Sequence, residues 1–144
     1  MRTRNRSGQA AVEFALVLPA FVIVLVVSVQ MALIGQLVTA LGQANYQGAR
    51  FASIHPDCDV NNCTGGETVP NDSIKHYVLS VISPTINSAK LTITATPAAP
   101  RGSGSSVVVK LTYDASGNLF LPQNFLGLIN FPTNLASTQS AMSQ

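Results

Sequence analysis

The side chain with the most unusual setting in this chain is a single carboxylate beside a long apolar segment. Glu13 lies five residues after Gly8 and is followed by Phe14–Ile34, a run of 21 residues without a formal charge. Three arginines precede the glycine: Arg2, Arg4 and Arg6. A charged side chain at the edge of a membrane span needs a partner and usually marks a functional site. Basic residues just before a span hold that end in the cytoplasm.

Two histidines and two cysteines are the other residues with catalytic or metal-binding potential. They are His55, His76, Cys58 and Cys63. Their spacing matches no zinc pattern, because the cysteines form one Cys-x4-Cys pair and no His-x3-His pair accompanies them. A Cys–His nucleophile stays open but has no support from any motif that names a mechanism. We therefore expect a protein that is not an enzyme and that uses no metal or cofactor.

The two cysteines lie close together in a polar loop. If this loop is exported, Cys58 and Cys63 are expected to form a disulfide, because such pairs oxidise outside the cytoplasm. The loop that it closes is short, so the bond stabilises the fold only modestly. Two unpaired thiols are the alternative.

The same loop resembles the start of a calcium-binding loop. Asp57, Asp59 and Asn61 place oxygen atoms at alternate positions, as such loops do. The sixth position is Asn62 instead of glycine, and the twelfth is Thr68 instead of glutamate. A polar turn closed by the disulfide explains the same residues and is the favoured interpretation, with calcium binding as the alternative.

Composition supports a membrane-anchored protein. Of the 144 residues 47% are hydrophobic and only 10% are charged, against a usual charged share of about 25%. The apolar run meets the length of about 20 residues that a helix needs to cross a bilayer. A cleaved secretory signal is the alternative, but its apolar region is about 7–15 residues long and ends at a small-residue cleavage site. The length therefore favours an uncleaved anchor with its transmembrane part at about residues 14–34.

The net charge of +2 comes from the first residues. Without Met1–Gly8 the chain has five basic and six acidic residues, and the basic ones are scattered. Clustered basic residues are the signature of nucleic-acid binding. No nucleic-acid partner is therefore expected.

One long helix is predicted from Gln9 to Ile54, after a short basic leader, Met1–Gly8, with nothing to fold. At 1.5 Å per residue this helix spans about 69 Å, so a bilayer uses only its first half. Pro19 removes one backbone hydrogen bond and is expected to kink the helix. The helix must end before Pro56, because a proline disfavours the helical conformation of the residue that precedes it.

Small residues repeat along the second half of this helix. Ala40, Ala44 and Gly48 stand at four-residue spacing, which lets another element approach closely. The sequence leaves two partners open, a helix of another subunit and the protein's own C-terminal domain.

The remaining residues, 55–144, predict a small extracytoplasmic α+β domain. A polar loop is expected at 57–72 and a short amphipathic helix at 73–82, with Asp72 or Ser73 as its cap. Alternating apolar and polar residues predict strands at Lys90–Thr96 and Ser106–Tyr113, and a third, polar strand is predicted at Asn134–Met142. We expect a small antiparallel sheet of about three strands, with the amphipathic half of the long helix packed across it.

The segment Asn118–Pro132 is rich in leucine and phenylalanine, and prolines at positions 122 and 132 prevent a long regular element. We interpret it as a loop that folds over the sheet as a lid on the core. The alternative is an exposed apolar surface that docks a neighbour.

The start of the chain resembles a known family. Residues Gly8 to Pro19, GQAAVEFALVLP, are similar to the processing site and helix start of TadE-like proteins, the minor pilins or pseudopilins of tight-adherence (Tad/Flp) pilus systems within the type IV pilin-like group. Phe14 stands where major Flp pilins usually have tyrosine, which favours the TadE branch. The resemblance implies that a prepilin peptidase cuts between Gly8 and Gln9, and that Glu13 aligns subunits.

The expected function follows from this resemblance and from the charge problem at Glu13. A cut after Gly8 creates a positive α-amino group at Gln9 on the same helix end, and this group or a neighbour's can neutralise Glu13. We expect a pilin-like subunit in the cytoplasmic (inner) membrane that later joins or primes a cell-surface Tad pilus used in adhesion. Its partners would be the prepilin peptidase, the membrane and other pilin subunits. The alternative is a single-span anchored envelope domain that binds a ligand and never polymerises.

Overall fold

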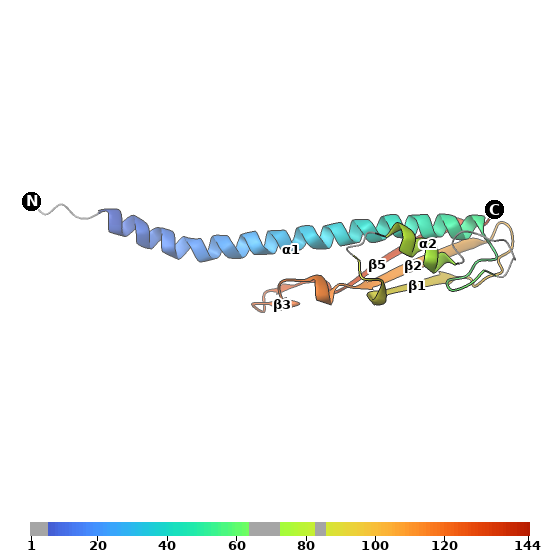
Figure 1. The fold of residues 1–144 in the computed structure, drawn as a ribbon. Helices are drawn as coiled ribbons and strands as arrows, with labels where there is room; N and C mark the ends of the chain where they lie inside the picture. The colour runs from blue at the N-terminus through green and yellow to red at the C-terminus, as the bar shows by residue number, and fades with distance from the viewer. Residues whose placement is uncertain (1–5, 64–72, 83–85) are drawn as a thin grey trace, which may run out of the picture. The chain divides into compact units, whose positions relative to one another are not determined.

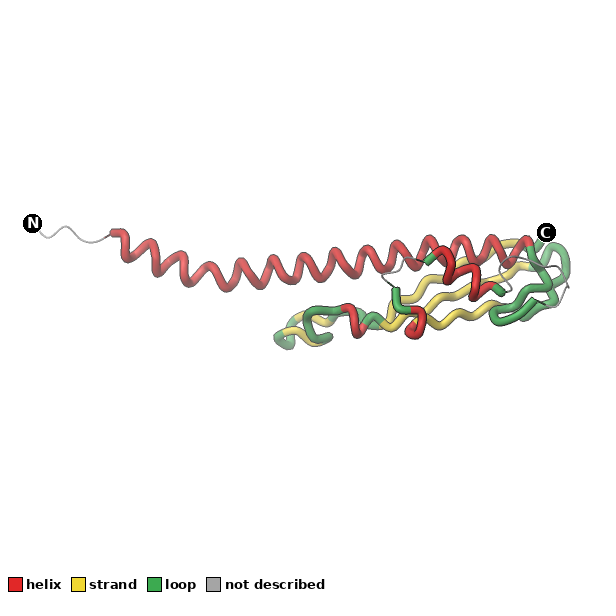
Figure 2. The backbone as a smooth tube through the Cα atoms, in the orientation of Figure 1, coloured by secondary structure: helices red, strands yellow, loops and turns green. Residues whose placement is uncertain are grey.

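The computed structural model describes residues 6–63, 73–82 and 86–144. In chain order the elements are α1 (Arg6–Ile54), α2 (Ile74–Val81), η1 (Ser88–Lys90), β1 (Leu91–Thr96), β2 (Ser106–Asp114), η2 (Ser116–Asn118), β3 (Asn124–Phe125), β4 (Ile129–Asn130) and β5 (Asn134–Met142). The chain divides into an N-terminal unit, Met1–Ile34, and a C-terminal unit, Gly35–Gln144. Figures 1 and 2 show the elements of each unit. The predicted α+β class is confirmed.

The N-terminal unit consists of the first part of α1. A helix was predicted here correctly, but its first residue was placed wrongly, because the helix begins at Arg6 and not at Gln9. The expectation that all of Met1–Gly8 is unfolded is therefore wrong for its last three residues. Arginine is a good helix former, so the helix can begin before the glycine. The predicted start followed the expected cleavage point and not the helix propensity.

The C-terminal unit is built on a three-stranded antiparallel sheet with the order β1-β2-β5. Leu91 pairs with Tyr113 at one end of β1 and β2, while Asp114 pairs with Asn134 and Ser106 with Met142 along β5. Buried and exposed side chains alternate along β2, as the apolar–polar alternation predicts. The strand positions are confirmed to within one residue, since β1 begins at Leu91 and β2 ends at Asp114.

One face of this sheet is covered by helices. Figure 1 shows α2 and the last part of α1 lying along the strands. The buried side chains include Leu41, Ala44, Ile74, Val78, Val107, Val109, Leu111 and Tyr113. Phe51 on α1 stacks on Tyr77 of α2 with ring centroids 4.7 Å apart, and the amide nitrogen of Asn45 donates to the Ser137 hydroxyl at 3.1 Å. The predicted packing of the amphipathic helix half across the sheet is confirmed.

The small-residue stripe is used inside the C-terminal unit. Ala44 and Gly48 are buried. A Cβ added to Gly48 would lie 2.6 Å from Val78 on α2 and 3.9 Å from Val109 on β2. The absent side chain therefore lets α1 approach α2 and the sheet. Of the two partners that the sequence left open, the protein's own domain covers these two residues.

Helix α2 confirms the predicted short amphipathic helix. Ser73 is its cap, and the Ser73 hydroxyl accepts a hydrogen bond from the His76 backbone N–H at 3.1 Å. Asp72, the other predicted cap, lies outside the described residues. Ile74 and Val78 face the core, whereas Lys75 and His76 are exposed.

The segment Asn118–Pro132 differs from the predicted lid. It forms a small hairpin in which Asn124 pairs with Asn130 and Phe125 with Ile129. Only Phe131 is buried in the core, while Phe120, Leu126 and Leu128 are among the exposed large apolar residues. The interpretation as a lid is wrong because β3 and β4 pair with each other and the apolar side chains of Phe120, Leu126 and Leu128 are exposed instead of buried in the core.

Candidate processing and membrane-span site

The residues predicted to take part in processing and alignment lie on the first turns of α1. Gly8, Gln9 and Glu13 are all helical and exposed. Gln9 and Glu13 are one turn apart on the same face, and the Gln9 side-chain amide donates to the Glu13 carboxylate at 3.3 Å. The structure therefore brings the residue after the expected cut next to the lone acidic side chain of the helix.

The peptide bond between Gly8 and Gln9 is accessible. Nothing lies within 4 Å of the position that a Cβ of Gly8 would occupy. This bond also lies within the first turn of α1, where backbone N–H groups have no partner inside the helix. Glycine further weakens a helix, by about 1 kcal/mol relative to alanine. Unwinding this turn therefore costs little.

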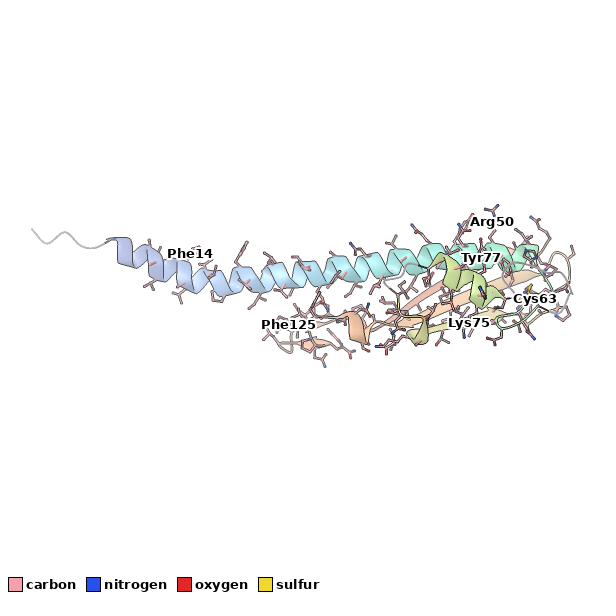
Figure 3. The ribbon with its side chains drawn as sticks, in the orientation of Figure 1. Phe14, Arg50, Cys63, Lys75, Tyr77 and Phe125 are labelled. Carbon is pink, nitrogen blue, oxygen red and sulfur yellow. A yellow bond between two sulfur atoms is a disulfide. The ribbon has the colours of Figure 1, made fainter. Side chains whose placement is uncertain are left out.

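The apolar segment that follows Glu13 has no covering within its unit. Every described side chain from Gly8 to Leu25 is exposed, including Phe14 at 67% and Leu16 at 74%. In Figure 3 the labelled side chain of Phe14 points away from the helix. Soluble proteins rarely expose so large a contiguous apolar surface. The helix is long and apolar enough to cross a membrane, with a mean hydropathy of 2.7 in its most apolar window.

Pro19 lies inside this segment, and α1 continues through it. Because proline has no N–H, the helix loses one hydrogen bond at this point. Figure 2 shows the axis of α1 bending in its first third, which contains Pro19. Proline is the commonest cause of such a bend.

A family model described as TadE-like protein matches residues 8–50. This segment is TadE-like. The match begins at the glycine of the expected cut and continues past the apolar run into the part of α1 that packs on the sheet. The resemblance drawn from Gly8–Pro19 is confirmed, and it extends over much more of the helix than those residues. Neither a curated protein nor a solved structure matches the chain.

The cysteines lie at the other end of the TadE-like helix, in the turn that follows it. Cys58 and Cys63 form a disulfide and also face each other as an isolated antiparallel bridge. Inside this turn the Asp59 backbone N–H donates to the Asn62 carbonyl at 2.7 Å. The turn is linked to α2, since the Ile74 N–H donates to the Asp59 carbonyl at 3.1 Å. The arrangement is that of a closed structural turn.

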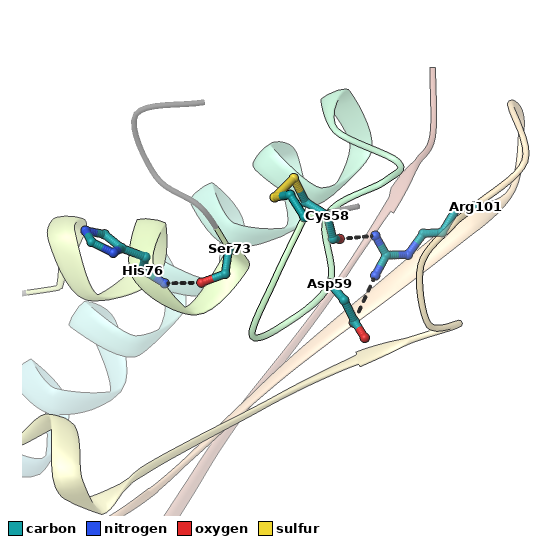
Figure 4. Close-up of a disulfide and its surroundings, with 6 residues drawn as sticks. Cys58, Asp59, Ser73, His76 and Arg101 are labelled. Atoms are coloured by element: carbon teal, nitrogen blue, oxygen red, sulfur yellow. Dashed lines mark hydrogen bonds and ion pairs between the residues drawn. A yellow bond between two sulfur atoms is a disulfide. The ribbon is translucent and has the colours of Figure 1, made fainter. Parts of the chain in front are cut away.

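Arg101 binds this turn through its side chain. No role was predicted for this residue from the sequence. Its guanidinium donates to the Cys58 carbonyl at 2.8 Å and lies 3.7 Å from the Asp59 carboxylate (Figure 4). It also donates to the Pro97 carbonyl at 2.8 Å. The Arg101 side chain is buried. Desolvation by this burial lowers the pKa of Arg101, and the attraction of Asp59 opposes that shift. An arginine in a loop rich in Pro and Gly is the signal that sequence reasoning could have used.

The residues with a calcium-like pattern and the histidines do not converge on a site. Asp59 already faces a cation, the Arg101 guanidinium, and Thr68 lies outside the described residues. Among the residues that the structure describes, no group of three His, Cys, Asp or Glu side chains could hold a metal ion. The His55 ring packs against the Phe51 ring, with the two ring centroids 4.6 Å apart. Figure 4 shows the imidazole of His76 well apart from the disulfide.

Proposed function

We propose that this protein is a pilin-like structural subunit of a Tad-type pilus. It is inserted in the cytoplasmic (inner) membrane, cut between Gly8 and Gln9 by a prepilin peptidase, and then incorporated into a pilus that serves adhesion, or used to prime one. Its role is assembly and not catalysis. The C-terminal unit faces away from the cytoplasm, because Arg2, Arg4 and Arg6 hold the start of α1 on the cytoplasmic side.

The observation that carries the proposal is an uncovered apolar helix with one acidic side chain at its start, inside a TadE-like segment. The apolar surface between Phe14 and Leu25 is exposed within the N-terminal unit. A bilayer covers such a surface, and so does a bundle of equivalent helices in a filament. A subunit that moves from one environment to the other needs this surface in both.

Glu13 determines how the subunit aligns when it moves from the bilayer into the filament. An isolated charge at the centre of a span costs roughly 2.5–3.5 kcal/mol on insertion scales. Cleavage after Gly8 leaves an α-amino group at Gln9 whose ordinary pKa is about 7.7–8.0, so it is largely positive at neutral pH. In the structure the Gln9 side chain already reaches Glu13. The amine of the same chain or of a neighbouring subunit neutralises Glu13, and the second option fixes the stagger between subunits.

The first test is the mass of the mature protein from cells that express the peptidase. A chain that begins at Gln9 supports the proposal. A chain that begins at Met1 contradicts it and favours the non-polymerising, single-span envelope domain. Gly8→Val is the matched variant, because among the described residues beyond the adjacent helix backbone nothing lies within 4 Å of a Cβ at this position. We expect Gly8→Val to insert normally but to remain uncut.

The second test removes the charge of Glu13 and keeps its shape. Glu13→Gln retains the volume and the hydrogen bond to Gln9, so we expect normal insertion and normal cleavage. Without the negative charge nothing selects the α-amino partner, and we expect the subunit to be missing from purified pili. Pili that contain Glu13→Gln at the wild-type level would contradict the alignment role.

A further inference from the structure

The hairpin that replaces the expected lid has features that the proposed function does not use. We call residues 119–131 the apolar hairpin; it contains β3, β4 and the turn between them. Its base is anchored, because Phe131 is buried in the core and its N–H donates to the Gln123 carbonyl at 2.9 Å. The tip is not anchored in this way. Leu126 is 64% exposed and Leu128 is 86% exposed.

The turn itself has an unusual residue. Leu126 has a φ of 53°, next to Gly127 with a φ of 69°. Left-handed positions in turns are normally taken by Gly, Asn or Asp, which adopt them at low cost in water. A leucine here strains the backbone and exposes an apolar side chain. A turn that only reversed the chain would gain from a polar residue, so the leucines at the tip indicate contact with something apolar.

Charge is absent from this part of the sequence. Asp114 is the last charged residue, and none follows from Ala115 to Gln144. The tip therefore brings no ion into an apolar medium. The backbone next to the tip is paired, through the β3–β4 pairs and a hydrogen bond from the Leu128 N–H to the Phe125 carbonyl at 3.1 Å. Paired backbone is what a segment needs to enter the boundary between lipid headgroups and acyl chains.

The hairpin lies toward the end of the C-terminal unit at which that unit's own part of α1 begins, at Gly35. β5 passes Asn45 at Ser137, and Gln144 after its far end donates to the carbonyl of Ser53. The strand therefore runs toward the end of α1, and the hairpin before it lies toward Gly35. Extended chain from Ser137 to Phe131 covers at most about 20 Å, and the helix from Asn45 to Gly35 about 15 Å. Figure 1 shows β3 beyond the sheet, at the end opposite the C-terminus.

We propose that the tip of the apolar hairpin inserts into the surface of the same bilayer that α1 spans, on its non-cytoplasmic side. The partner is lipid, at the boundary of headgroups and acyl chains. Gly35 is the first residue of the C-terminal unit and directly follows the span in sequence, so the hairpin lies at the end of the unit at which the chain leaves the span. This inference rests on the membrane span of the proposed function but not on cleavage or filament assembly.

The small size of the tip favours lipid over a second protein. A stable protein interface needs about 800 Å² from each partner and some 20–30 residues. The tip offers a few apolar side chains, among them Leu126, Leu128 and the half-buried Phe125, which Figure 3 labels. Binding to a membrane surface grows with the apolar area inserted and needs no matching partner surface. A few leucines beside an existing anchor are enough.

The chain contains no tryptophan, so single tryptophan variants report on one site at a time. We would reconstitute the full-length protein in phosphatidylcholine vesicles with and without brominated acyl chains, which quench tryptophan by contact. Leu128→Trp places the probe at the tip. Phe21→Trp probes the span. Met142→Trp is the matched control, because Met142 is 74% exposed and lies at the opposite end of β5.

The inference predicts that brominated lipid removes most of the emission of Leu128→Trp and Phe21→Trp and leaves that of Met142→Trp unchanged. Quenching of Phe21→Trp alone would overturn the inference and leave the span intact. Equal quenching of Leu128→Trp and Met142→Trp would show unspecific adsorption and overturn it as well.

Two further outcomes would also overturn it. A blue-shifted Leu128→Trp spectrum without quenching would show that the tip contacts protein, such as a second copy. Absence of quenching in all three variants would refute the membrane span itself, on which the proposed function depends.

Discussion

Gly48 offers the sharpest test of how α1 is joined to the C-terminal unit. In Gly48→Ala the new Cβ would lie 2.6 Å from a methyl carbon of Val78, with Ile74 and Val109 each at 3.9 Å around it. Val78 is fully buried and, as a β-branched residue, has little freedom at χ1. The clash must therefore be relieved by moving α1 away from α2, and not by turning one side chain.

The size of the effect follows from two opposing contributions. Alanine stabilises a helix by about 1 kcal/mol relative to glycine. An extra methyl group in a packed core costs about 1–3 kcal/mol. At Gly42 nothing lies within 4 Å of the added Cβ, so Gly42→Ala gains the helix contribution alone. We expect the two variants to differ in free energy of unfolding by about 1–3 kcal/mol, with Gly42→Ala the more stable.

Differential scanning calorimetry of the full-length protein in detergent measures this difference. For a unit of roughly this size, 1 kcal/mol corresponds to about 4 °C in Tm. We therefore expect Gly48→Ala to melt about 4–12 °C below Gly42→Ala. Equal melting temperatures, or a higher one for Gly48→Ala, would refute the close approach of α1 and α2 at this residue. The wild type serves as the reference for both.

Two further predictions concern charged groups of the C-terminal unit. Arg101→Ala removes the hydrogen bonds to the carbonyls of Cys58 and Pro97 and is expected to cost about 3 kcal/mol, measured by denaturant unfolding; Arg101→Lys restores the charge but not both bonds and should recover only part. Hydrogen bonds from the Ser116 backbone N–H and hydroxyl hold the pKa of Asp114 below its usual range. The stability that Asp114 contributes is therefore present above its unfolded pKa of about 3.9 and is lost as the pH falls through its lower folded pKa. The difference in free energy of unfolding between wild type and Asp114→Ala should therefore shrink in that acid range.

The strands could be predicted from the sequence because their signal is local. In β2 every second residue from Val107 to Tyr113 is buried, and a period of two over this length has few other interpretations. The cap of α2 is local too, since Ser73 and His76 lie within one turn. Such features need no knowledge of what packs against them.

The features that were missed depend on residues far apart in the chain. Arg101 became a structural residue because the turn at Cys58 lies next to it in space, although the two are 43 positions apart in sequence. The hairpin at 119–131 was misread because its composition fits a core lid as well as an exposed surface. The exposure of Leu126 and Leu128 decides between them. Composition gives the amount of apolar surface but not the side of the domain on which it lies.

The two halves of α1 have different surroundings, and this difference bears on the proposed assembly. Within the C-terminal unit the helix buries Leu37, Leu41 and Phe51, whereas in the N-terminal unit the residues from Phe14 to Leu25 are exposed. Lipid tails are as apolar as leucine, so moving the exposed half from a bilayer into a bundle of like helices changes its hydrophobic free energy little. The group whose energy does change is Glu13, which is costly in lipid without a partner and inexpensive beside an ammonium group. The direction of transfer would then depend on one ion pair, and Glu13→Gln should remain in the membrane at least as readily as the wild type while losing the drive to leave it.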